Sequence, residues 1–187
     1  MNSIEQIKAY SPCCEQEMRD KDVMLTFLTD NDDGFLRSNL TAHMTASAWV
    51  LSPDRTRVVM VYHNIYNSWS WVGGHADGDT DLAAVAMREV QEETGIREME
   101  LLEAGIFSLE NLAVEGHMKN GAYVPSHVHM NITYLLRAKD DVLRCKRDEN
   151  SGVKWMTPKE ALASSTEPWM VEHVYRKLIE KAKAYMA

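Results

Sequence analysis

The sequence predicts an α/β fold in which a mixed β-sheet is covered by helices. Short β-rich runs flank one central segment of helical periodicity, and a second helical segment lies near the end of the chain. Elements in this order bury their apolar faces as an α/β/α sandwich. With 187 residues, of which 45% are hydrophobic, the chain is long enough to bury one core of ordinary size.

The N-terminal segment, residues 1–40, differs from the rest of the chain in being polar with an apolar rhythm typical of a helix. Three residues carry that rhythm: Met18, Leu25 and Leu28. The turn-rich run Asp-Asn-Asp-Asp-Gly at residues 30–34 interrupts it. We therefore expect a helical extension over residues 1–40, packed on a domain that covers residues 41–187.

Strand patterns begin after the extension. Residues 43–51 and 57–63 are expected to form a hairpin around the turn Ser52-Pro53-Asp54. Gly73 and Gly74 are expected to turn the chain sharply after the next strand. The central helix follows, with Asp79, Thr80 or Asp81 as its cap and Gly95 at its end.

The second half of the chain returns to extended segments. These cover residues 100–114, 127–138 and 153–156, and an Asn120-Gly121 turn signal separates the first two. A final helix is expected from about Pro168 to Tyr185.

Composition excludes several classes of function. The net charge of -8 argues against a general nucleic-acid binder, which needs clustered Lys and Arg. No apolar run approaches the length of a membrane span, and the first residues lack the pattern of a signal peptide. The odd set Cys13, Cys14 and Cys145 is typical of reduced thiols. We expect a cytoplasmic protein without a nucleic-acid or membrane partner.

Three glutamates share one face at the end of the central helix. Glu89, Glu92 and Glu93 stand at relative positions i, i+3 and i+4, within a single helical turn. Their charges repel one another, and the negative end of the helix dipole adds to the repulsion. Such a cluster is either a solvated acidic helix end or a site for a hard divalent cation such as Mg2+ or Mn2+.

The residues around the glutamates decide between these interpretations. The stretch from Gly74 to Ile96 resembles the signature of the Nudix (MutT-like) hydrolases, G-x5-E-x7-R-E-U-x-E-E-x-G-U, where U is a bulky aliphatic residue. Arg88-Glu89-Val90, Glu92-Glu93 and Gly95-Ile96 all stand in register with Gly74. Only the first glutamate of the signature is missing, because Thr80 stands in its place. The resemblance, over roughly residues 43–180, implies a Nudix-type α/β/α sandwich with a mixed sheet.

In the family, the glutamate that Thr80 replaces braces the loop against the helix. Asp77 or Asp79 is expected to supply the missing carboxylate after a small shift of the loop.

The resemblance also implies an activity. Nudix pyrophosphohydrolases cleave a phosphoanhydride bond of a nucleoside diphosphate linked to another moiety, using Mg2+ or Mn2+ and a metal-activated water. It implies that Glu89, Glu92 and Glu93 are metal ligands and that Arg88 orients Glu89. The apolar stripe of the same helix is expected to face the core: Leu82, Val85, Ala86 and Val90. The partner is then a small diphosphate compound derived from a nucleotide, and relatives are often homodimers.

A further carboxylate often completes Nudix sites from a loop outside the signature. Glu149 is our candidate for the fourth ligand or general base, because it precedes the strand residues Trp155-Met156 at a suitable spacing. Its rivals are Glu110, Glu115 and Asp148.

Substrate-binding candidates lie on both sides of the central helix. Gly73 and Gly74 would let backbone amides approach a phosphate. Trp69, with Tyr66 and Trp71, either stacks on a nucleobase or belongs to the core. His127 and His129 alternate on one strand and so face one side of the sheet, as cleft-lining residues or, less often, metal ligands. Of these we select Trp69 and His129 as substrate-binding residues.

Two alternatives to hydrolysis stay open. A ligand sensor on a Nudix fold would keep phosphate binding without catalysis, and Thr80 is a hint of such decay. An isomerase of prenyl diphosphates would need a cysteine near the cleft, whereas Cys13, Cys14 and Cys145 lie in the N-terminal segment and in a charged loop. No marker residue in the segment 108–112 identifies the substrate.

Overall fold

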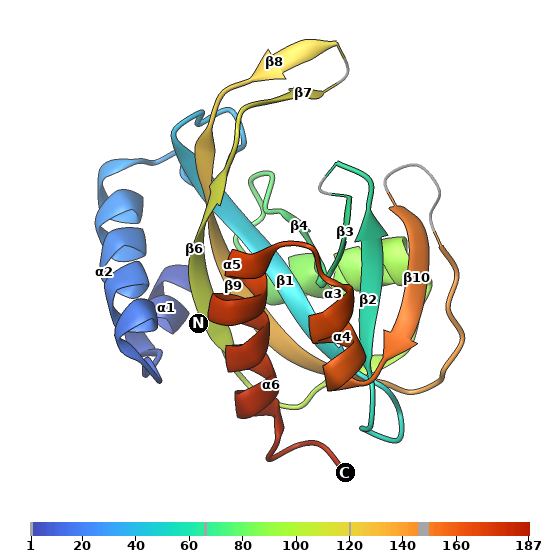
Figure 1. Ribbon diagram of the computed structural model, residues 1–187. Helices are drawn as coiled ribbons and strands as arrows, with labels where there is room; N and C mark the ends of the chain where they lie inside the picture. The colour runs from blue at the N-terminus through green and yellow to red at the C-terminus, as the bar shows by residue number, and fades with distance from the viewer. Residues whose placement is uncertain (1, 66, 120, 146–149) are drawn as a thin grey trace.

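The computed structural model describes residues 2–65, 67–119, 121–145 and 150–187, and a mixed β-sheet forms its centre (Figure 1). The two central strands, β1 (Ala42–Leu51) and β9 (His127–Ala138), run parallel and pair along the whole of β1. Every residue of β1 is buried. A strand covered on both faces must lie inside a layered fold.

The remaining strands pair antiparallel around this central pair, in the order β10-β2-β1-β9-β5 with β3, β4 and β6 beside β2, β1 and β9. Their bounds are β2 (Val58–His63), β3 (Ser68–Ser70), β4 (Val72–His75), β5 (Met99–Leu101), β6 (Ser108–Val114) and β10 (Asn150–Met156). A separate hairpin of β7 (His117–Lys119) and β8 (Ala122–Val124) projects from the end of the sheet (Figure 1).

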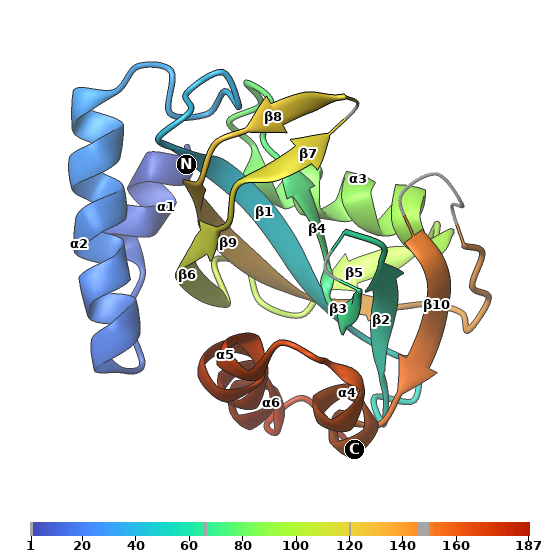
Figure 2. The ribbon, with the colours of Figure 1, turned by 45° about the horizontal axis from the view of Figure 1, so that its top comes forward.

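Helices cover both faces of the sheet (Figure 2). On one face, α3 (Leu82–Thr94) buries the predicted stripe against the sheet: Leu82, Val85, Ala86 and Val90. The other face is covered by helices from the end of the chain: α4 (Pro158–Ser164), α5 (Pro168–Met170), the π-helical turn η1 (Val171–Tyr175) and α6 (Arg176–Ala182). The predicted α/β/α sandwich with a mixed sheet is therefore confirmed.

The N-terminal segment forms two helices, α1 (Ser3–Ala9) and α2 (Glu15–Asp30), beside β6 (Figure 1). Ile7, Met24 and Leu28 join the same apolar core as α3. Glu17 of α2 is fully buried, and its carboxylate lies 3.3 Å from Nζ of Lys177 on α6. The two helices are thus tied to the body by apolar packing and by a buried ion pair. Within the described ranges, no helix has the length and apolarity to span a membrane.

The structure corrects several details of the predicted elements. Gly73 and Gly74 continue β4, and the sharp turn comes later, at Asp77 and Gly78, which both have positive φ. The hairpin of β1 and β2 pairs only at Leu51↔Val58, because β1 takes β4 and β9 as its main neighbours.

The C-terminal helical run also departs from the prediction. The π-helical turn η1 interrupts it, and the short α4, begun by a capping box at Thr157, was not predicted.

Candidate active site

The end of β4 meets α3 at an unusually close contact. A methyl group on Gly74 would lie 2.4 Å from Cδ of Glu89 and 2.6 Å from its Oε1. The carboxylate of Glu89 therefore rests on the bare Cα of Gly74, and a larger residue would displace it. This contact explains in physical terms why a glycine stands fifteen residues before this glutamate.

Gly73 has a different neighbour. A methyl group there would lie 2.3 Å from Oγ of Ser47 and 2.9 Å from the carbonyl oxygen of Ala46, both on β1. Gly73 pairs with Ser47 in the antiparallel register of β1 and β4. Close strand packing thus accounts for Gly73, and its role in phosphate binding stays a prediction.

The loop between β4 and α3 is fastened by the N-terminal segment. Nε of Arg37 donates to Oδ1 of Asp77 over 2.5 Å, and the N–H of Gly78 donates to the carbonyl of Phe35 over 2.8 Å. The hydrogen bond from Arg37 is the main cause that lowers the pKa of Asp77. Oγ of Ser3 donates to the carbonyl of Thr80 over 2.5 Å. These contacts connect the N-terminal segment to the loop in which Thr80 replaces the glutamate of the signature.

Asp79 links the same loop to α3. Its Oδ2 accepts from Nη1 of Arg88 over 3.3 Å, and its Oδ1 accepts from the N–H of Asp81 over 2.9 Å. Asp81, one of the three predicted caps, accepts from the N–H of Ala84 over 3.1 Å and is the N-cap. Of the two expected carboxylates, Asp79 contacts the helix through Arg88, whereas Asp77 contacts Arg37, and their replacement of the missing signature glutamate stays a prediction. Arg88 contacts the loop through Asp79, while its predicted role in orienting Glu89 stays a prediction.

The three glutamates differ in exposure. Glu92 is exposed, Glu89 is half-buried, and Glu93 is only 6% exposed, although the helix pattern predicted it on the polar side. Burial of a carboxylate is costly unless a cation or hydrogen bonds compensate it. Oxygen donors of this kind, gathered on one helical turn beside an open Cα, fit the preference of Mg2+ and Mn2+.

The helix that carries the glutamates ends as predicted. Gly95 adopts the left-handed conformation with φ 74°, and its N–H donates to the carbonyl of Gln91 over 3.1 Å. The N–H of Arg144 donates to the carbonyl of Thr94 over 2.7 Å, so the segment after β9 covers this end of α3.

The predicted substrate residues separate into two places. His129 lies beside His75, the residue after Gly74, with ring centroids 4.9 Å apart. Because side chains alternate along a strand, His75 points to the sheet face opposite the contact of Gly74 with Glu89. Trp69 packs instead against β2 and β10. Its ring centroid lies 5.4 Å from that of Tyr62 on β2 and 5.2 Å from Nζ of Lys154 on β10. Trp71 belongs to the core against Tyr175, and Tyr66 lies outside the described residues.

The structure describes only some of the candidates for the fourth carboxylate. Glu149 and its rival Asp148 lie outside the described residues. Glu110 is fully buried and accepts from Lys177 at 3.0 Å, from Asn131 at 3.2 Å and from Thr133 at 3.2 Å. Those contacts make Glu110 part of a buried polar network. Its carboxylate is therefore already engaged on the sheet face opposite α3.

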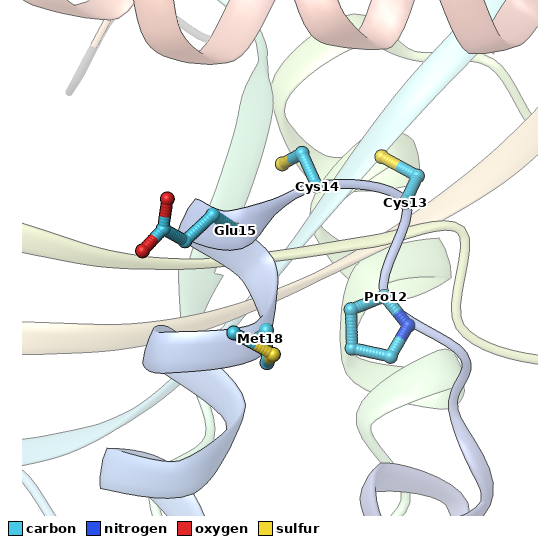
Figure 3. Close-up of a pocket in the computed structure, with 5 residues that line it drawn as sticks. All are labelled: Pro12, Cys13, Cys14, Glu15 and Met18. Atoms are coloured by element: carbon cyan, nitrogen blue, oxygen red, sulfur yellow. The ribbon is translucent and has the colours of Figure 1, made fainter.

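Two of the three cysteines lie in the N-terminal segment. Cys13 and Cys14 are exposed in the loop that joins α1 to α2, whereas the half-buried Cys145 follows Arg144, which contacts the end of α3. Figure 3 shows the first two at a surface hollow of about 510 Å3, whose lining contains no residue of α3: Pro12, Cys13, Cys14, Glu15 and Met18. This placement disfavours Cys13 and Cys14 as the cysteine that an isomerase would need beside the glutamates.

Several residues around the site escaped the sequence prediction. Arg37 lies 40 residues from its partner Asp77, and His43 and His75 meet His129 only through strand pairing. The only signal for the histidines was their position on predicted strands. Their convergence depends on the parallel register of β1 and β9, which no local pattern encodes.

Comparison with known proteins identifies the domain. The model of the NUDIX domain matches residues 41–181. No curated protein matches the chain.

Solved structures of low identity share the fold. A NUDIX-family hydrolase from Clostridium perfringens is 14% identical, with a TM-score of 0.54, and the match covers 74% of this chain and 97% of that one. The dihydroneopterin triphosphate pyrophosphohydrolase of E. coli is 17% identical, with a TM-score of 0.54 and coverage of 73% and 95%. An Ap4A hydrolase of C. elegans is also 17% identical, with a TM-score of 0.53 and coverage of 76% and 96%.

Proposed function

Because this chain belongs to the NUDIX domain family of pyrophosphohydrolases, we propose that it hydrolyses the diphosphate bond of a nucleoside diphosphate linked to another moiety. The observation that carries the proposal is the contact between the Glu89 carboxylate and Cα of Gly74, which has no side chain. Glu92 and Glu93 lie on the same helical turn as Glu89. A helix end with these charges gains nothing in stability from them. Their arrangement suits a divalent cation.

The proposed metal ligands are Glu89, Glu92 and Glu93, and the ions are Mg2+ or Mn2+. When bound, such ions neutralise the diphosphate and lower the pKa of a coordinated water. Gly74 keeps the Glu89 carboxylate in place, and Arg88 holds the loop through Asp79. These residues fix donor positions before the substrate arrives, which is how positioning contributes to rate.

Substrate contacts are proposed on two sides of the glutamates. The backbone of Gly73 and Gly74 binds phosphate oxygens, His129 lines the cleft beside His75, and Trp69 contacts the base. Glu149 is proposed as the base that accepts the proton of the attacking water. We further propose that residues 1–40 form an extension that stabilises the site loop, since Ser3 and Arg37 already contact it.

The proposal is tested with a panel of diphosphate compounds in Mg2+ and in Mn2+. The panel contains nucleotide sugars, nucleoside triphosphates, coenzyme A, Ap4A and dihydroneopterin triphosphate. Wild-type protein is compared with Glu92→Gln and with the matched control Glu98→Gln, which changes an exposed glutamate outside α3. We expect release of phosphate-containing products by the wild type and the control, and their loss in Glu92→Gln.

Two other outcomes bear on the alternatives. Tight binding of one compound without any product would replace hydrolysis by the sensor function. An unchanged rate in Glu149→Gln would remove Glu149 from the mechanism while leaving the ligand trio intact.

A further inference from the structure

Three histidines from three strands meet on the sheet face opposite α3, because their strand neighbours Ala42, Met44 and Met130 pack in the core on the α3 side. His43 is the second residue of β1, His75 ends β4, and His129 lies on β9 directly opposite His43 in the parallel register. Their ring centroids form a nearly equilateral triangle with sides of 5.1, 5.0 and 4.9 Å. One ring nitrogen from each residue lies within 4.8 Å of the other two. Such convergence is typical of a metal centre.

The two ring nitrogens of His43 differ in their hydrogen bonds. Its Nδ1 lies 3.0 Å from the carbonyl oxygen of Asn39, which can only accept, so Nδ1 carries the proton. Nε2 is then the lone-pair nitrogen. It is buried and makes no hydrogen bond within the part of the chain that the structure describes, which is rare for a buried polar atom. A metal ion would satisfy it.

A relay of hydrogen bonds gives His129 the corresponding state. Nδ1 of His127 lies 2.8 Å from the carbonyl oxygen of Pro125 and therefore donates to it. In neutral His127, Nε2 is then an acceptor, and it lies 3.0 Å from Nε2 of His129, which must donate. Nδ1 of His129 is then unprotonated, and its lone pair can bind a metal ion. A ligating histidine held by a second hydrogen bond is the usual outer shell of a metal site.

The environment also keeps these rings neutral, as ligation requires. Burial, followed by the charge of Arg37 and by His43, lowers the pKa of His75 to about 3. Burial and then the neighbouring imidazoles lower the pKa of His129 to about 2. Burial is also the main cause that lowers the pKa of His43. The rings therefore do not need to lose a proton when an ion binds near pH 7.

We infer that His43, His75 and His129 form a binding site for a divalent transition-metal ion of the Zn2+ class, separate from the carboxylate site on α3. Imidazole nitrogen suits Zn2+, Co2+, Ni2+ and Cu2+, whereas Mg2+ prefers oxygen. A tetrahedral ion with bonds of about 2.0–2.1 Å holds its ligand atoms roughly 3.3 Å apart, so each ring moves inward by at most about 1 Å. Three protein ligands leave one position for water or a substrate atom. This inference goes beyond the proposed hydrolysis and does not depend on it.

The test is a titration of the metal-stripped protein with Co2+, followed by visible absorption and by calorimetry. With excess Mg2+ present to compete for the carboxylate site, we expect one Co2+ ion per chain to be retained, with the absorption of nitrogen-ligated, four-coordinate Co2+. Affinity should fall by more than about 100-fold in His129→Gln and in His75→Asn, beyond the loss seen when only outer-shell groups change. Circular dichroism confirms that each variant is folded.

Two matched controls separate this site from other sources of binding. His173→Asn changes an exposed histidine on η1 and should leave the Co2+ signal intact. Glu92→Gln should leave it intact as well, since the carboxylates belong to the other site. The inference is overturned if the wild type binds no Co2+, if His129→Gln and His75→Asn both bind it as tightly as wild type, or if only Glu92→Gln abolishes binding.

Discussion

Gly74 and Glu89 are in direct contact: the Glu89 carboxylate occupies the space that a side chain at position 74 would fill, 2.4 Å from the position of a Cβ. The contact joins the end of β4 to the last turns of α3, the two elements that carry most of the signature residues. It makes the identity of residue 74 a determinant of where a metal ligand points.

Gly74→Ala should therefore impair catalysis more than folding. The new methyl group pushes away the end of a flexible side chain, so the free energy of unfolding should change by about 1 kcal/mol or less. The displaced carboxylate should lower kcat by about 10–100-fold, as misplacement of a catalytic group does. Steady-state hydrolysis in Mg2+ and urea unfolding measure the two effects. Gly105→Ala is the matched control, because among the described residues no atom beyond its two chain neighbours lies within 4 Å of the added methyl group.

The contact between Arg37 and Asp77 should matter for activity although it is exposed. Both side chains are about half exposed, so Arg37→Gln should cost only about 0–1 kcal/mol of stability. Freed from this contact, the loop that carries Asp77 should position α3 less well, and kcat/KM should fall about 3–10-fold. Arg19→Gln, which removes a more exposed arginine of α2, should leave kcat/KM unchanged. Equal effects of the two substitutions would argue against a bracing role for Arg37.

The buried carboxylate of Glu17 should make folding sensitive to acid. Burial alone would raise its pKa, but hydrogen bonds from Tyr10 and Cys13 and the charges of Lys177 and Lys181 outweigh burial and lower the pKa from 4.5 to about 2. A carboxylate with a lowered pKa stabilises the fold above its unfolded pKa and loses that contribution as pH falls through its folded pKa. Wild-type stability should therefore drop between about pH 4.5 and pH 2.

Glu17→Gln should be less stable at pH 7, by about 1–3 kcal/mol, because it removes one of the two carboxylates that face the buried Lys177, which keeps its contact with Glu110. It should also lose part of the decline between pH 4.5 and pH 2. Urea unfolding at several pH values measures both quantities for wild type and variant. Parallel curves for the two proteins over that range would show that Glu17 is not the titrating group.

His127 should affect Co2+ binding without ligating the ion. His127→Phe keeps a ring at this position but removes the acceptor for Nε2 of His129, so the tautomer of His129 is no longer fixed. Loss of such an outer-shell group typically weakens metal affinity by about 10–100-fold. Calorimetry with Co2+ checks the value. A loss as complete as that in His129→Gln would instead make His127 a ligand.

The fold was predictable to the extent that local patterns encode it. The periodicity of the central helix, its cap among Asp79, Thr80 and Asp81, and its stop at Gly95 all follow from short-range chemistry, and the structure confirms them. The strand over residues 127–138 was also correct. The pairing of β1 with β9 was not predictable, because it joins residues more than eighty positions apart.

The residues of the candidate site were likewise predictable only where they are close together in the sequence. The glutamates and Gly74 share one contiguous stretch, so their spacing alone brought them together. Arg37 and Ser3 reach the loop from the N-terminal segment, and His43 reaches His129 through the parallel register. The burial of Glu93 likewise depends on tertiary packing, which the spacing of the three glutamates along the helix does not encode.

The most direct test of the central claim is the initial rate of diphosphate hydrolysis as Mg2+ is added to metal-stripped protein. We predict no hydrolysis without the ion, saturation as Mg2+ rises, and a maximal rate lower by at least about 100-fold in Glu92→Gln, as when a group that stabilises developing charge is removed. Hydrolysis that needs no divalent ion, or that proceeds at the wild-type rate after Glu89, Glu92 and Glu93 are all changed to Gln, would contradict the account.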